Sequence, residues 1–214
     1  MVTNKTKIVL SAKEQEMVCN TEWILTKHQI VQKVVALFGA VLANLQIITE
    51  QHKSNLPRAI FVQSPKISKG ENYKGLPYIM LDYPRHFNKE DVLAVRSLFW
   101  WGNFFSISIQ LSGKFKTAAV LHFTTNFLML QQQEFWICVN DNPWEHHFEA
   151  DNYVSLKSLT AVEFGTLISQ QSFIKMSKKI TLPQWNEVPV FLEQAFLQMI
   201  LLLKTSYLNG EIDL

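Results

Sequence analysis

The run Leu81–Phe87 brings together side chains of the kinds used in acid–base chemistry. An acid, a guanidinium and an imidazole follow one another as Asp82, Arg85 and His86. Strand ends and the loops after them are common places for binding and catalytic residues. In such a place Asp82 would orient His86, and His86 would act as a general base near neutral pH. The alternative is a polar turn without chemistry, because residues four apart around a proline need not face each other.

A hairpin follows this run. Residues 105–111 alternate between apolar and polar side chains, which is the period of a strand with one apolar face. Gly102 and Asn103 come just before it and suit a two-residue turn. The sequence therefore predicts a hairpin in which residues 96–101 pair with residues 104–111.

Arg96 takes an unusual place in this hairpin. A two-residue turn sets Arg96 opposite Ile109, on the apolar face. A guanidinium does not lose its charge on burial, so it needs an anion or several acceptors. Three interpretations remain: an ion pair with Asp82, a shifted register that brings Arg96 to solvent, or a guanidinium that awaits a ligand carboxylate or phosphate.

Aromatic side chains surround the same turn, among them Trp100 and Trp101, and Tyr78 lies earlier in the chain. With an arginine nearby, such a group can stack on a flat or sugar-like ligand. A hydrophobic core at the hairpin end and a partner interface are the alternatives. The candidate ligand-binding residues are therefore Tyr78, Asp82, Arg85, His86, Arg96, Trp100 and Trp101.

The two adjacent histidines, His146 and His147, are the only histidine cluster. Neighbouring residues point apart on a strand and diverge by about 100° on a helix, and no spacing to Cys138 matches a zinc pattern. The motifs of phosphate loops, dinucleotide folds, serine hydrolases and zinc proteases are absent from the sequence. We therefore predict no metal and no cofactor, and the sequence leaves open whether the chain is an enzyme.

Length, net charge and cysteine content indicate which class of protein the chain belongs to. The 214 residues suit one domain spanning 1–214, and the net charge of +2 gives no basic patch for nucleic acid. Cys19 and Cys138 are interpreted as reduced thiols of a cytoplasmic protein. The first ten residues show no signal peptide. The apolar stretch 34–48 is shorter than the roughly 20 residues that a membrane span requires, so we predict a buried helix and no membrane contact.

The spacing of apolar residues, together with the positions of capping residues, glycines and prolines, predicts the helices and strands around these residues. A helix is expected from Ser11, which fits a capping box with Glu14, to 18, and a second from a cap at Asn20 or Thr21 to 53. Further helices are expected over 89–95, 114–131, 158–170 and 188–207. Strands are expected over 58–63, 76–83, 134–140 and 173–182, in addition to the hairpin, with a polar loop over 66–75.

These elements predict an α+β fold, in which helices from both termini pack on a mixed or mainly antiparallel sheet formed by the central region. The leading functional hypothesis is a non-catalytic module that binds a ligand or a partner, including a homo-oligomer formed through the apolar helix 188–207. The alternative is a small hydrolase-like enzyme that acts on an anionic substrate through the Asp82, Arg85, His86 and Arg96 cluster.

Overall fold

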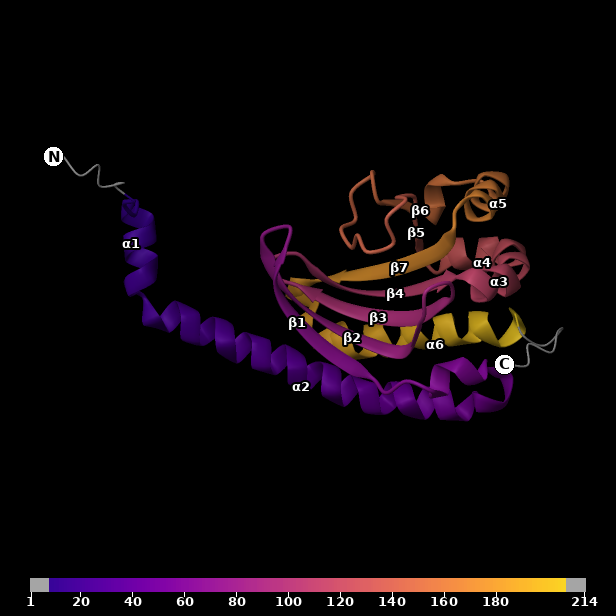
Figure 1. The fold of residues 1–214 in the computed structure, drawn as a ribbon, viewed down its shortest axis with the longest axis horizontal. Coiled ribbons are helices and arrows are strands. Elements are labelled where there is room, and N and C mark those ends of the chain that lie inside the picture. Colours follow the sequence, from indigo (N-terminus) through magenta and orange to yellow (C-terminus); the bar gives the residue numbers. More distant parts are fainter. Residues whose placement is uncertain (1–7, 207–214) are drawn as a thin grey trace.

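A seven-stranded antiparallel sheet organises residues 8–206, the part of the chain that the computed structural model describes (Figure 1). The strands lie in the order β1-β2-β3-β4-β7-β5-β6. Their bounds are β1 (Lys66–Tyr73), β2 (Leu76–Phe87), β3 (Val92–Trp100), β4 (Phe104–Ser112), β5 (Trp136–Cys138), β6 (Tyr153–Ser155) and β7 (Phe173–Thr181). The expected α+β class is confirmed.

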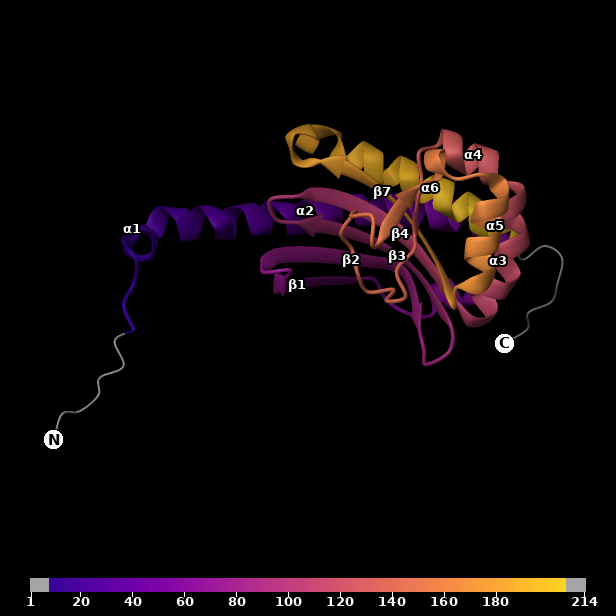
Figure 2. The same ribbon diagram turned by 90° about the horizontal axis from the view of Figure 1, so that it is seen from above.

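Helices cover one face of this sheet and one of its ends (Figure 2). They are α1 (Ala12–Cys19), α2 (Thr21–Gln51), α3 (Gly113–Thr125), α4 (Phe127–Gln132), α5 (Ala161–Gln170) and α6 (Val188–Ser206). Short 3₁₀ helices are η1 (Lys53–Asn55), η2 (Arg58–Phe61), η3 (Leu156–Ser158) and η4 (Leu182–Glu187). The long helices α2 and α6 pack against each other and against the sheet.

The N-terminal helices begin where their capping residues predict. The Ser11 hydroxyl accepts from the backbone N–H of Glu14 in a capping box, and the Asn20 side chain accepts from the N–H of Trp23. Helix α1 and the first turns of α2 extend away from the sheet (Figures 1 and 2). Gly39 causes neither a break nor a close crossing, because α2 is continuous and an added Cβ there would meet nothing within 4 Å.

The apolar residues of α2 and α6 are buried in the chain's own core. Helix α2 contributes Val34 and Phe38, and α6 contributes Phe196 and Met199, all fully buried. By length and composition alone, α2 and the segment Leu182–Leu203 are apolar enough to cross a membrane, a property that core helices of soluble proteins share. Neither the absence of membrane contact nor a homo-oligomer through α6 is tested by this packing, so both stay predictions.

Several predicted elements are confirmed in kind. The helix expected over 114–131 forms as α3 and α4, and the segment 158–170 contains α5. The strands expected over 134–140 and 173–182 form as β5 and β7. The last helix is present to Ser206, and its expected final residue, Tyr207, lies outside the described residues.

Three local predictions are wrong. Residues 58–63 contain the 3₁₀ helix η2 rather than a strand, and residues 66–73 form β1 rather than a polar loop. Residues 89–95, expected as a helix, contain a turn and the beginning of β3. For β1 and β3, pairing with the neighbouring strands decides the structure over local propensity. Strand β1 has polar residues on both faces because it lies at the edge of the sheet.

Strand β2 also continues past Pro84, where the sequence predicted its end. The register between β2 and β3 shifts between Asp82 and Arg85, which marks a bulge. A bulge leaves a residue outside the ladder, and proline, which has no N–H to donate, is tolerated there. The bulge therefore lets the strand carry both Asp82 and His86.

Candidate functional site

Arg96 is neutralised by Asp82. The two residues are direct cross-strand partners of β3 and β2. The Nε of Arg96 donates to Asp82 Oδ1 at 2.6 Å, and its Nη2 donates to Oδ2 at 3.0 Å. A bidentate pair of this kind fixes both side chains. The ion pair that was one of the three interpretations of Arg96 is therefore present.

The predicted register of the hairpin is wrong by one residue. Trp100 pairs with Phe104, so three residues connect the strands, and Arg96 lies opposite Ser108 rather than Ile109. Arg96 therefore lies on the face of the sheet turned away from α2 and α6. It does not reach solvent, because its side chain is only 14% exposed. The sequence placed Arg96 on the apolar face of the sheet, whereas in the structure it lies on the polar face.

A loop covers this polar face at its centre. Residues 139–152, which connect β5 and β6, are called the cover loop below. The Lys175 ammonium of β7 donates to the backbone carbonyls of Pro143 at 2.8 Å and Glu145 at 2.5 Å. The Tyr73 hydroxyl accepts from the N–H groups of His146 and His147 at 2.7 and 3.0 Å. Side chains from β1 and β7 thus hold the cover loop in place.

The charges beneath the cover loop are desolvated. Burial lowers the pKa of Lys175 to about 7, and the nearby Arg96 charge also lowers it. Burial, with the positive charges of Lys175 and Arg96, lowers the pKa of His146 well below its usual value. Burial raises the pKa of Tyr73 to about 12. These groups form hydrogen bonds with one another and with the backbone, so the polar groups of the cluster have their partners within the chain.

Arg85 and His86 do not join this cluster. The Arg85 Nε donates to the Ser64 carbonyl at 2.6 Å. His86 pairs with Leu93 of the core face, and its ring lies edge-on against Phe115, with centroids 5.4 Å apart. Asp82 lies on the opposite face of the sheet, so it does not orient His86. The arrangement in which Asp82 would orient His86 as a general base is therefore not present.

The aromatic residues of the hairpin are core. Trp100 is buried on the polar face with Met80 and Leu98, and its Nε1 donates to the Tyr73 carbonyl at 3.3 Å. Tyr78 packs beside this cluster, and its ring occupies the space that a side chain at Gly70 would need. Trp101 packs instead against the main core. The seven candidate residues therefore form no common pocket.

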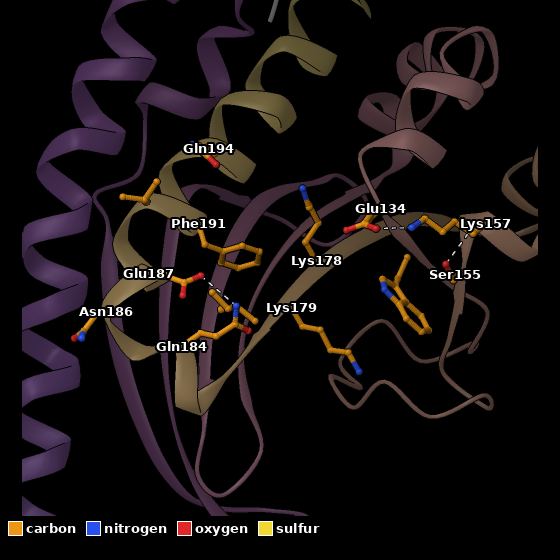
Figure 3. A pocket seen from close by; sticks show the side chains of 13 residues that line it. Glu134, Ser155, Lys157, Lys178, Lys179, Gln184, Asn186, Glu187, Phe191 and Gln194 are labelled. Atoms are coloured by element: carbon orange, nitrogen blue, oxygen red, sulfur yellow. Dashed lines mark hydrogen bonds and ion pairs between the residues drawn. The ribbon is translucent and has the colours of Figure 1, made fainter.

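A groove opens elsewhere on the sheet, at its β7–β5 junction (Figure 3). Its volume is about 750 Å³, within the range of pockets that hold ligands. Lys178 and Lys179 of β7 lie between two walls in Figure 3. One wall carries Glu134 and Lys157, and the other carries residues of η4 and α6 such as Phe191.

Lysines outnumber carboxylates by three to two among the described residues that line the groove. Glu134 forms an ion pair with Lys157, and Glu187 accepts from the Gln184 amide at 3.1 Å. Among the described side chains, no carboxylate forms an ion pair with Lys178 or Lys179. The groove therefore has an excess of positive charge.

Each of these lysines is held by weaker contacts. The Lys178 ammonium donates to the Gln198 side chain at 3.1 Å, whereas that of Lys179 lies 4.8 Å from the ring centre of Phe148 and 5.2 Å from that of Trp136. Partial burial lowers the pKa of both lysines. Because desolvation disfavours the charged form, a nearby anion would stabilise both ammonium groups.

The floor of the groove is an unpaired strand edge. All nine residues of β7 pair with β4 on one side. On the other side, β5 pairs with β7 only at Met176 and Ser177. Glu134, just before β5, has a positive φ of 62°, and the chain there bends away from β7. Among the described residues, no strand pairs with this side of residues 178–181.

The sequence did not reveal this groove. Its lining comes from segments around residues 134–136, 155–157, 178–180 and 184–194, which meet only in the fold. The one local sign was the adjacent pair of lysines within the strand predicted over 173–182. Two charges in succession on a central strand place one charge on each face of the sheet, and one of those faces is expected to be core.

His146 and His147 point to different partners, as expected for adjacent residues. His146 faces Lys175 and Arg96, whereas His147 Nε2 lies 3.1 Å from Asp151 Oδ1. Within residues 8–206, no group of three or more potential ligand residues is arranged to hold a metal ion. Comparisons with protein-family models, curated proteins and solved structures find no match for this chain.

Proposed function

We propose that this chain is a non-catalytic module that binds an anionic partner in the groove beside β7. One observation carries the proposal: Lys178 and Lys179, which are adjacent on β7 and point to opposite faces of the sheet, both line one open groove, and neither has an ion-pair partner among the described residues. Folded proteins rarely leave partly desolvated charges uncompensated unless a ligand compensates them. A carboxylate or phosphate between the groove walls would supply the missing charge.

The chemistry of the lining supports binding rather than catalysis. Among the residues that the structure describes, no histidine, cysteine or aspartate lines the groove. Both of its glutamates already interact with neighbours, Glu134 with Lys157 and Glu187 with Gln184. Trp136 and Phe191 add apolar surface to the same lining. Two cations beside aromatic surface favour recognition of an anion that carries an apolar part.

A titration followed by nuclear magnetic resonance tests the proposal. Inorganic phosphate, free glutamate and the acidic peptide acetyl-VTEDVT-amide are each added to the isotope-labelled full chain. We expect at least one probe to shift the amide signals of residues 178–180 and of Trp136. The same probe should have little effect on a Lys178→Gln/Lys179→Gln variant. If every probe acts instead on the cover loop, or shifts the double variant equally, the groove is not the binding site.

A further inference from the structure

The free edge of β7 defines what kind of partner suits the groove. Alternate residues within 178–181 direct their backbone N–H and C=O groups to the side that faces the cavity, and no strand within the described residues pairs with that side. A strand edge of this kind is a template for pairing with another extended chain. Four residues span about 13 Å, which corresponds to a short strand. A small anion would leave this edge unused, whereas an extended polypeptide would pair with it.

The lysines specify the side chains of such a strand. Lys178 pairs with Ile107 on the core face and contacts Gln198 of α6. Lys179 pairs with Ser106 on the opposite face. In an added strand, two consecutive residues would lie opposite this pair, one on each face. Opposite charges stabilise such cross-strand pairs, so both consecutive residues should be acidic.

The walls supply room for the residues on either side of the acidic pair. Trp136 and Phe191 line the groove on its two sides, and Ile180 and Val190 add aliphatic surface. Strand addition draws affinity from main-chain hydrogen bonds and specificity from such side-chain pockets. Apolar or β-branched residues beside the acidic pair would fit these walls and favour an extended conformation.

We propose that the partner is an acidic segment of another polypeptide, which binds in extended conformation and pairs with residues 178–181 of β7 as an added strand. The proposal rests on the function proposed above, and it specifies the ligand. Two consecutive acidic residues of the segment face Lys178 and Lys179. The strand lies in the groove between the Glu134–Lys157 wall and α6.

Three peptides separate the contributions of charge and strand pairing. The reference is fluorescently labelled acetyl-VTEDVT-amide, and acetyl-VTQNVT-amide keeps its shape without its charge. The third peptide has the acidic sequence with N-methyl groups on alternate backbone nitrogens, and it is made in two versions that block the N–H groups of one edge of the strand or of the other. We expect anisotropy titrations to show binding at least about tenfold weaker for the neutral peptide and for one N-methylated version, because each loses one type of contact.

Variants of the chain test the position. Lys179→Glu reverses the charge of an exposed residue and should weaken binding of the acidic peptide at least about tenfold. The milder Lys178→Gln/Lys179→Gln variant should also weaken it, which covers the case of a variant that does not fold. The control is Lys89→Glu, the same change at an exposed residue beyond the opposite end of the strands, and it should bind within about twofold of the original.

Amide exchange gives a direct readout of the added strand. Saturating acidic peptide should protect at least one amide hydrogen among residues 178–181 from exchange. If both N-methylated versions bind as well as the reference and no amide is protected, the strand proposal is overturned, although the anion-binding function still stands. If neither the acidic peptide nor phosphate nor glutamate binds in a manner that depends on the two lysines, both proposals are overturned.

Discussion

Lys175 and Lys179 lie on the same strand and on the same face of the sheet, yet their surroundings are opposite. Lys175 is 1% exposed, and its ammonium donates to two carbonyls of the cover loop. Lys179 is exposed, and its ammonium contacts aromatic rings but no carboxylate. The cover loop closes the first site, and the separation of β5 from β7 opens the second.

The difference shows how to distinguish a structural charge from a binding charge. Beneath the cover loop, Lys175, Arg96 and Asp82 all have partners within the chain. Such a network holds a loop in place and leaves no group for a ligand. In the groove, neither lysine forms an ion pair with a described carboxylate, although the charge of Glu134 acts on Lys178 from a distance, so an external anion would add to their stabilisation. The four predictions below test this contrast, from the largest expected effect to the smallest.

Removing the Asp82 carboxylate from the cluster beneath the cover loop should cause the largest loss of stability. In Asp82→Ala the Arg96 guanidinium remains buried without its anion, and we expect the free energy of unfolding to fall by about 3–5 kcal/mol. The control Glu71→Ala removes the exposed partner of Lys27 and should cost less than about 1 kcal/mol. Urea unfolding measures both. Equal losses in the two variants would mean that the polar cluster is not a buried network.

Replacing the buried Lys175 should lower the free energy of unfolding more than replacing the exposed Lys179. At pH 9, where the Lys175 amine is neutral, Lys175→Met leaves the Pro143 and Glu145 carbonyls without their donor. We expect a loss of about 3 kcal/mol in the free energy of unfolding. Lys179→Met is the matched control, with an expected loss below about 1 kcal/mol. If the control loses as much, the two lysines do not differ as described.

The lowered pKa of Lys175 predicts a pH dependence of stability. The folded state releases the proton near pH 7, whereas the unfolded state keeps it until its ordinary value near 10.5. Above pH 7 the unfolded state therefore binds more protons, and stability rises with pH by up to about 1.4 kcal/mol per pH unit. Arg96, Glu145, Cys138 and His146 face the same amine, so the comparison is with Lys175→Met, which retains them.

The measurement is the difference in unfolding free energy between the original chain and Lys175→Met. We expect this difference to shift in favour of the original by about 2 kcal/mol between pH 7 and pH 9. A constant difference over that range would show that the folded and unfolded states share one pKa for this lysine.

The smallest effect has the opposite sign. Lys178→Met removes a half-buried charge whose pKa is lowered by desolvation, and it places an apolar side chain beside Phe135. We expect a gain of about 0.5 kcal/mol in the free energy of unfolding, as is common when a binding residue is replaced. Urea unfolding at pH 7 measures it. A loss of more than about 1 kcal/mol would assign Lys178 a structural role.

Sequence reasoning reached the fold class because its strongest patterns are local. The caps at Ser11 and Asn20 and the alternation over residues 105–111 are each read within a few residues. The Asp82–Arg96 pair, which the structure contains, was one of three interpretations of Arg96, because a buried guanidinium requires an anion and one carboxylate lay nearby. The hairpin register was missed by one residue, because three residues rather than two connect its strands.

Strand β1 and the groove were beyond such reasoning for a physical reason. Residues 66–73 are polar and form a strand only because β2 pairs with them. The groove exists because β5 leaves β7 after two pairs, a property of long-range packing rather than of either segment. Nor does the sequence indicate that the cover loop buries Lys175 but leaves Lys179 exposed, with only the Phe148 ring against its ammonium.

Amine labelling of the full chain, with and without acetyl-VTEDVT-amide, tests the contrast between the two lysines most directly. At pH 8 the Lys175 amine, with a pKa of about 7, is mostly neutral and would react readily if reagent reached it. We predict that mass spectrometry finds Lys175 unlabelled in both samples, and Lys179 labelled alone but protected by saturating peptide. Labelling of Lys175 in the folded chain, or labelling of Lys179 that the peptide does not change, would contradict the account.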